Sequence, residues 1–162
     1  MENVVIWGSG TGYCKLINLL RFYDRGGVFH IIGVTSNEDF YISIDGYPFI
    51  KKEMLKEINF NYIIVTMDDY QSALKEAEIL FGSQIQEKMI VGKVLQHPRF
   101  NFDKYIKILK NIPTIISNDC FAGYLYHRLG LPFQSPTINM FWTPENYYKL
   151  LCNLKEYMEK PI

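Results

Sequence analysis

Residues 3–12 read Asn3-Val-Val-Ile-Trp-Gly-Ser-Gly-Thr-Gly12, a short apolar run that ends in a glycine-rich turn. An amphipathic helix pattern follows, with the apolar residues between Tyr13 and Tyr23 on one face. A second apolar run spans 29–34 and is typical of a buried strand. Strand, glycine turn, helix and strand together predict a βαβ unit over residues 3–34. This unit places the chain in the α/β class with a parallel sheet.

The glycine turn is the first candidate ligand site. Glycines let the backbone approach a phosphate, and the N–H groups that open a helix point towards an anion. Gly8 and Gly10 fit the first two positions of the dinucleotide fingerprint, but the third position falls on Tyr13. A nucleotide or nucleotide-sugar is therefore a possible ligand, and the alternative is a turn that only packs the helix on the strand. The candidate ligand-binding residues are Gly8, Ser9, Gly10, Thr11, Gly12 and Ser36.

NAD is the less favoured cofactor because the end of the second strand lacks an acid. In dinucleotide-binding folds an acidic residue at that position binds a ribose hydroxyl. Thr35 and Ser36 stand there in this chain. Ser36 and Asn37 can still form a hydrogen bond with a sugar hydroxyl, without the charge-assisted strength of a carboxylate.

The rest of the first hundred residues continues the alternation of strands and helices, and a polar connector at 93–103 follows. We therefore predict a Rossmann-like three-layer domain at residues 1–100. Its further predicted elements are strands at 61–66 and 88–92 and helices at 51–58 and 68–81.

Residues 104–162 predict a second α/β module, which begins with a helix that Asp103 caps. Two apolar runs have the length and composition of strands, and helix patterns follow each of them. The chain is thus predicted to hold two βαβ-type modules. The elements predicted after the first helix are strands at 114–117 and 137–142 and helices at 120–129 and 144–159.

Cys120, Asp119 and His127 are the candidate catalytic residues of the second module. Cys120 is predicted at the amino end of a helix, where the helix dipole favours the thiolate. His127 follows Cys120 by two helical turns. The helical rise per residue places the two residues about 10 Å apart, which is too far for a direct nucleophile–base pair. The alternatives are a structural cysteine and histidine, and an Asn118 or Asp119 that only caps the helix.

The two predicted strands of this module also predict where its polar residues lie. Parallel strands would bring Ser117–Cys120 and Trp142–Thr143 to the carboxyl edge of the sheet, where α/β proteins bind ligands. Ser135 and Pro136 precede their strand and would lie at the opposite edge. We therefore expect the segments around Ser117 and Ser135 to lie apart.

Composition argues against several classes of function. Lys+Arg and Asp+Glu number 17 each in 162 residues, so no excess positive charge favours nucleic acid or an anionic membrane. No apolar run approaches the ~20 residues that span a bilayer. Cys14, Cys120 and Cys152 lack the spacing of a zinc site or a disulfide framework, so we predict no metal and a cytoplasmic protein. The expected partner is a small molecule.

The first hundred residues resemble the Rossmann-like module that precedes many sugar-modifying and polysaccharide-assembly proteins. In sugar acyltransferases such a module can hold a nucleotide-sugar, and the resemblance implies the same ligand here. The corresponding segments are Gly8-Ser-Gly10, Ile32-Gly-Val34, Asp45-Gly-Tyr-Pro48 and Tyr62-Ile-Ile-Val65.

Residues 113–142 resemble the family that carries domain of unknown function 1919. The motif is Ile116-Ser-Asn-Asp-Cys-Phe-Ala-Gly-Tyr-Leu-Tyr-His-Arg-Leu-Gly-Leu131, followed by Ser135-Pro-Thr-Ile-Asn-Met-Phe141. Members of this family occur among exopolysaccharide and capsule biosynthesis proteins. The resemblance implies a role in polysaccharide biosynthesis, a possible transferase acting on an activated sugar, and a domain that continues beyond Ile162.

The resemblance to part of a longer domain leads to one expectation about association. A sheet cut off after the last helix would expose an apolar face or a strand edge, so we expect the chain to form a homo-oligomer or to cover that face. A non-catalytic binding or scaffold protein is the alternative to an enzyme.

Overall fold

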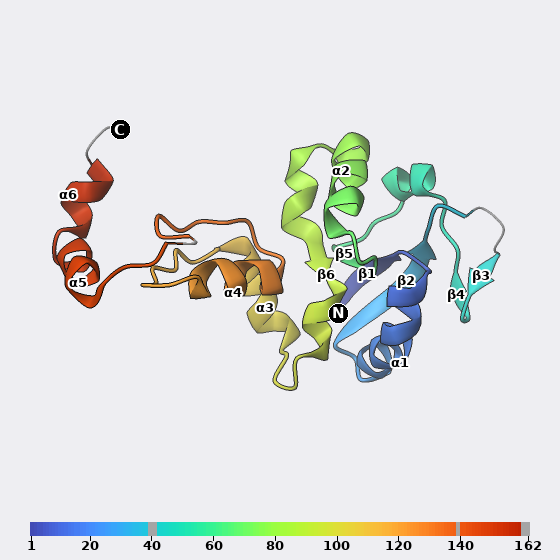
Figure 1. The fold of residues 1–162 in the computed structure, drawn as a ribbon. Helices are drawn as coiled ribbons and strands as arrows, with labels where there is room; N and C mark the ends of the chain where they lie inside the picture. Colours follow the sequence, from blue (N-terminus) through green and yellow to red (C-terminus); the bar gives the residue numbers. More distant parts are fainter. Residues whose placement is uncertain (39–41, 139, 160–162) are drawn as a thin grey trace. The chain divides into compact units, whose positions relative to one another are not determined.

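The computed structural model describes residues 1–38, 42–138 and 140–159 (Figure 1). Its contacts group the chain into two compact units, Met1–Lys110 and Asn111–Ile162. The sequence predicted a division near residues 100–104 instead. The helix α3 (Phe102–Lys110) belongs to the first unit because Phe102 packs on two aromatic rings of that unit's sheet.

The first unit is built on a four-stranded parallel sheet with the order β2-β1-β5-β6. The apolar runs form these strands because they are buried on both faces, as parallel strands in α/β proteins are. The α/β class is thereby confirmed. The strands are β1 (Glu2–Trp7), β2 (Phe29–Thr35), β5 (Tyr62–Val65) and β6 (Met89–Val91).

Helices cover both faces of this sheet and make three layers (Figure 1). Successive side chains of a strand point to opposite faces. Val5 and Trp7 of β1 therefore belong to the core under α2 (Tyr70–Phe81). The opposite face is covered by α1 (Thr11–Arg25), which buries Tyr13, Leu16 and Leu20.

Three short 3₁₀ helices and one hairpin complete the first unit. The sequence predicted a helix at 51–58, and a 3₁₀ helix stands there. The Asp45-Gly46 turn joins the two strands of the hairpin with left-handed backbone angles, φ 54° and 87°. These elements are η1 (Lys52–Glu57), η2 (Ser83–Lys88), η3 (Gly92–Gln96), β3 (Ser43–Ile44) and β4 (Tyr47–Pro48).

The second unit is helical in its described residues, with α4 (Phe121–Leu129), α5 (Pro144–Cys152) and α6 (Leu154–Glu159). The predicted α4 and its glycine stop at Gly130 are confirmed. The predicted helix at 144–159 is divided at Asn153. The side-chain amide of Asn153 donates to the Lys149 carbonyl, and its backbone leaves the helical region.

The strands predicted at 114–117 and 137–142 are wrong for the residues that the structure describes, which exclude Asn139. A strand needs a ladder of backbone hydrogen bonds. Among the described residues, one backbone hydrogen bond joins these extended segments, from Trp142 N to the carbonyl oxygen of Asn118, directly after residues 114–117, at 2.9 Å. Side chains hold them instead, so the second βαβ unit does not form among these residues.

Gly12 lets α1 begin directly against the end of β5. A Cβ atom at Gly12 would lie 1.9 Å from the carbonyl oxygen of Thr66. Gly10 differs, since a Cβ atom there would meet no atom within 4 Å. Packing therefore requires a glycine at position 12 but not at position 10.

We expect Gly12→Ala to lower the free energy of unfolding by about 2–3 kcal/mol, because α1 must shift away from the sheet. Gly10→Ala is the matched control and should cost no more than about 1 kcal/mol, the penalty of alanine at a helix N-cap. Chemical denaturation of the two variants measures both values. Equal losses would contradict the assigned contact.

Candidate functional site

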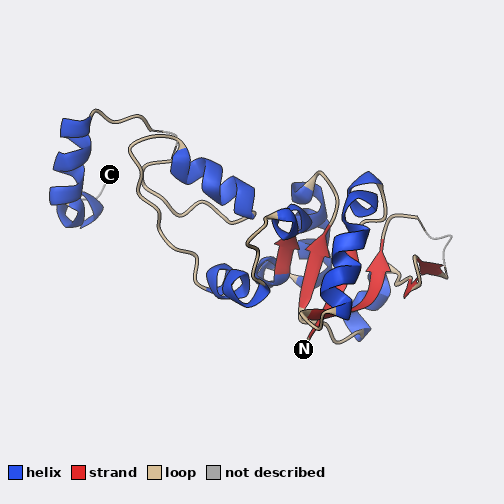
Figure 2. Ribbon diagram, turned by 90° about the horizontal axis from the view of Figure 1, so that it is seen from below, coloured by secondary structure: helices blue, strands red, loops and turns tan. Residues whose placement is uncertain are grey.

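The glycine turn lies at the point where the strand order of the sheet reverses. The chain passes from β1 through α1 to β2 on one side, and then crosses to β5 on the other side of β1. Figure 2 shows the strands of this sheet in red, side by side. In open α/β sheets, ligands bind beyond the carboxyl ends of the strands at such a switch point. Residues 8–12 follow β1 directly and therefore occupy that position.

The first glycine of the turn is held by both neighbouring strands. Gly8 has φ 112°, a value that favours glycine. Its N–H donates to Thr35 O at 2.8 Å, at the end of β2. Its carbonyl oxygen accepts from the Thr66 hydroxyl at 2.8 Å, beyond the end of β5. The conformation of the turn is thus fixed by the sheet.

The amino end of α1 offers donors that the helix does not use. Gly10 is the N-cap residue and α1 has no side-chain cap. The first N–H groups of a helix have no partner within it. Thr11 is exposed and Ser9 is half-buried, and both stand next to Gly10 in the sequence. This arrangement can hold an anion.

The other predicted ligand-binding residue, Ser36, forms a local turn. Its hydroxyl accepts from Glu38 N at 3.2 Å and lies 3.3 Å from Glu38 O. The side-chain oxygen of Asn37 accepts from Lys52. The preceding Thr35 is fully buried, and its hydroxyl has no hydrogen-bond partner within the described residues. The groups predicted to bind a sugar hydroxyl are therefore partly engaged by the protein.

Lys52 is a residue near this edge that the sequence did not indicate. Its ammonium pairs with Glu76 on α2 and lies 4.9 Å from the centroid of the Trp7 ring. The Lys52 side chain is only 14% exposed. In the sequence Lys52 stands in an ordinary run of charged residues, which gives no sign of a special role. Its contact with the end of β1 is visible only in the structure, where the chain passes it after the hairpin.

A second ion pair joins the ends of β5 and β6. Lys93 Nζ lies 2.9 Å from Asp68 Oδ1, and both side chains are mostly exposed. The hydrogen bond and charge of Lys93 hold the pKa of the Asp68 carboxyl below its usual value, and Lys15 on α1 adds a smaller effect. Lys52 and Lys93 thus both lie at this edge, and each is paired with a carboxylate.

The candidate catalytic residues of the second unit gather only in part. Cys120 is exposed at the N-cap of α4, and the carboxylate of Asp119 accepts from Phe121 N at 2.8 Å. The Ser117 hydroxyl accepts from Ala122 N at 3.2 Å. His127 lies in the last turn of α4. Asp119 and Cys120 are therefore adjacent, and the structure does not bring His127 to them.

The two parts of the motif at 113–142 meet, against the expectation that they lie apart. Ser117 N donates to Thr137 Oγ1 at 3.1 Å. Thr137 Oγ1 in turn lies 3.3 Å from Ser135 Oγ. The prediction was wrong because it assumed two parallel strands. Without a ladder, the extended segments approach each other through side chains.

Tyr126 organises this region and was missed by the sequence reading. Its ring is fully buried, and its hydroxyl accepts from Ile115 N at 2.9 Å. The hydroxyl has one proton, which it can donate to the carbonyl oxygen of Pro113 or Gln134. A buried tyrosine needs such partners. The position of Tyr126 on the buried face of α4 was the signal that could have revealed this role.

Two negative findings apply to the part of the chain that the structure describes. No group of three or more His, Cys, Asp or Glu side chains there is arranged to hold a metal ion. None of the helices in those residues combines the length and the apolar character of a membrane span.

Comparison with known proteins gives two family matches. Residues 1–93 match the family described as "C2185-like, N-terminal". Residues 91–162 match the domain of unknown function 1919, which confirms that domain for the second half of the chain. A protein of Haemophilus influenzae (strain Rd), described as uncharacterized, is 33% identical over 75 residues. That alignment spans 45% of this chain and 36% of the relative's length.

Tyr126→Phe tests the role of the buried hydroxyl. We expect the free energy of unfolding to fall by about 1–2 kcal/mol, since Ile115 N loses an acceptor in a partly buried place. Hydrogen–deuterium exchange at Ile115 should become faster. Tyr124→Phe is the control, because Tyr124 is exposed on the same helix and its hydroxyl accepts from the exposed Arg128. Equal exchange rates at Ile115 in both variants would refute this role.

Proposed function

We propose that this chain, which belongs to the C2185-like N-terminal family, binds a nucleoside diphosphate or a nucleotide-sugar at the glycine turn. The family match covers the first unit up to residue 93 and includes the turn. The proposal rests on the geometry of Gly10 at the sheet's switch point.

Gly10 is the observation that carries the proposal. Packing explains Gly12, and the φ of Gly8 explains that residue. Gly10 has φ −80° and open space where a side chain would stand, so the fold itself accepts other residues there. A glycine at this position is useful for the close approach of a phosphate to the backbone.

The donors around Gly10 fit a diphosphate. The first N–H groups of α1 have no partner within the helix, and the helix dipole favours negative charge there. Ser9 and Thr11, which stand on either side of Gly10 in the sequence, add hydroxyl groups to the turn. Sugar recognition is expected to be loose, because the Ser36 hydroxyl is held by Glu38 and no carboxylate stands at the end of β2. Nucleotide-sugars should therefore bind better than NAD.

A finer part of the proposal concerns the pathway and the reaction. The resemblance of residues 113–142 to proteins of exopolysaccharide and capsule biosynthesis supports a cytoplasmic role in polysaccharide assembly, with transfer of a group to or from an activated sugar. Asp119 and Cys120 at the amino end of α4 are the residues to examine for such a transfer. Family descriptions that state no activity leave this part to experiment.

A non-catalytic scaffold protein is the second candidate. The observation in its favour is that the fold already explains two glycines, Gly8 by its positive φ and Gly12 by the packing of α1 against Thr66. In that case the turn binds no ligand and only joins the strand to the helix.

Thermal shift and calorimetry with a panel of nucleoside diphosphates, their sugars, NAD and NADP separate the two candidates. We expect nucleotide-sugars to stabilise the protein at millimolar concentration more than NAD does. Gly10→Leu should weaken this binding by about tenfold or more, the value of one lost charge-assisted hydrogen bond. The unfolding midpoint of the free Gly10→Leu variant controls for damage to the fold.

The protein is a non-catalytic scaffold if no nucleotide in the panel shifts its melting temperature. The same conclusion follows if Gly10→Leu binds nucleotide as tightly as the unaltered chain.

A further inference from the structure

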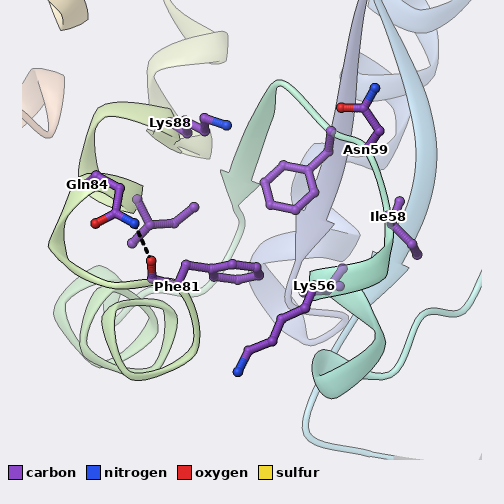
Figure 3. A pocket seen from close by; sticks show the side chains of 9 residues that line it. Lys56, Ile58, Asn59, Phe81, Gln84 and Lys88 are labelled. Carbon is purple, nitrogen blue, oxygen red and sulfur yellow. Dashed lines mark hydrogen bonds between the residues drawn. The ribbon is translucent and has the colours of Figure 1, made fainter.

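A cavity of about 260 Å³ lies at the edge of the sheet opposite to the glycine turn (Figure 3). Its lining comes from η1 and the segment before β5, and from the end of α2 and η2 before β6. The strands are parallel, so these residues stand at the amino ends of β5 and β6. The cavity is therefore independent of the nucleotide site proposed above.

The inner wall of the cavity is apolar. The rings of Phe60 and Phe81 meet edge to face, with centroids 5.7 Å apart. Phe60 and Ile85 are buried, and Phe81 is half-buried. Such a wall favours a flat, apolar group that can pack beside the two rings.

The rim of the cavity is positively charged. Lys56 and Lys88 project from opposite sides of the opening (Figure 3). Lys88 Nζ lies 5.8 Å from the centroid of the Phe60 ring. Among the residues that the structure describes, no Asp or Glu lines the cavity. The ion pairs recorded among the described residues include neither lysine, whereas the nearby Lys52 is paired with Glu76.

We propose that this cavity binds a small amphiphilic anion, an aromatic ring that carries one carboxylate or phosphate group. The ring would lie against Phe81 and Ile85, and the anionic group would lie at the rim, near Lys56 or Lys88. Unpaired positive charge beside an apolar wall is complementary to this class of molecule. The volume, near the lower end of ligand pockets, fits a single ring.

Ligand titrations followed by NMR test the proposal on the whole chain. The probes are benzoate and phenyl phosphate, with benzyl alcohol as the ring without a charge and acetate as the charge without a ring. We expect the two aromatic anions to shift the backbone amide signals of residues 56–60 and 81–88 at millimolar concentration. A response to one of them alone still supports the site and identifies the anionic group.

Charge-removing variants give the second measurement. Lys56→Met combined with Lys88→Met should weaken the binding of the aromatic anion about fivefold, as expected for partly exposed ion pairs. Lys75→Met is the matched control, because Lys75 is an exposed lysine of α2 outside the cavity. It should leave the affinity unchanged.

Three results would overturn the proposal. Benzyl alcohol or acetate could shift the same signals as strongly as benzoate, which would remove the role of charge or ring. The second such result is that none of the probes shifts these signals. Lys75→Met could weaken binding as much as the double variant does, which would make the effect one of net charge.

Discussion

The first unit depends on the contact between the start of α1 and the end of β5. Thr66 makes this contact twice, because its carbonyl oxygen touches the helix at Gly12 and its hydroxyl donates to Gly8 O. The same residue extends the pairing of β5 with β1, since Thr66 N donates to Trp7 O at 3.0 Å. A larger residue at position 12 would separate helix and sheet. The direction in which α1 presents its free N–H groups is thus fixed by a buried threonine.

The glycines of this short turn differ in whether the fold requires them. The fold requires Gly8 and Gly12, whereas Gly10 lies at the surface, where a side chain would meet no other atom. This division explains why a glycine fingerprint alone cannot distinguish a ligand site from a packing device. The structure shows that the fold requires Gly8 and Gly12 and does not require a glycine at position 10.

The sequence predicted the first unit better than the second for a physical reason. Residues 4–7 of β1 and residues 62–65 of β5 are apolar, which is what burial between two helical layers requires, and the helix patterns between the strands are local. The segment 114–117 holds the apolar pair Ile115 and Ile116, yet a strand also needs a partner at the right distance. Here the Tyr126 hydroxyl takes the backbone hydrogen bond from Ile115 N. No local pattern reveals such a partner, and the same holds for Lys52 beside Trp7.

The strand order has a consequence for how the protein is made. β1 leaves the ribosome first, but it is a central strand, and its partner β5 begins at Tyr62. Thr66, which closes the glycine turn, follows Gly8 by 58 residues. At a synthesis rate of roughly 5–20 residues per second, the turn waits about 3–12 s for that residue. Through this interval the apolar residues of β1 lack β5 and α2, so chaperone contact during synthesis is most useful at β1.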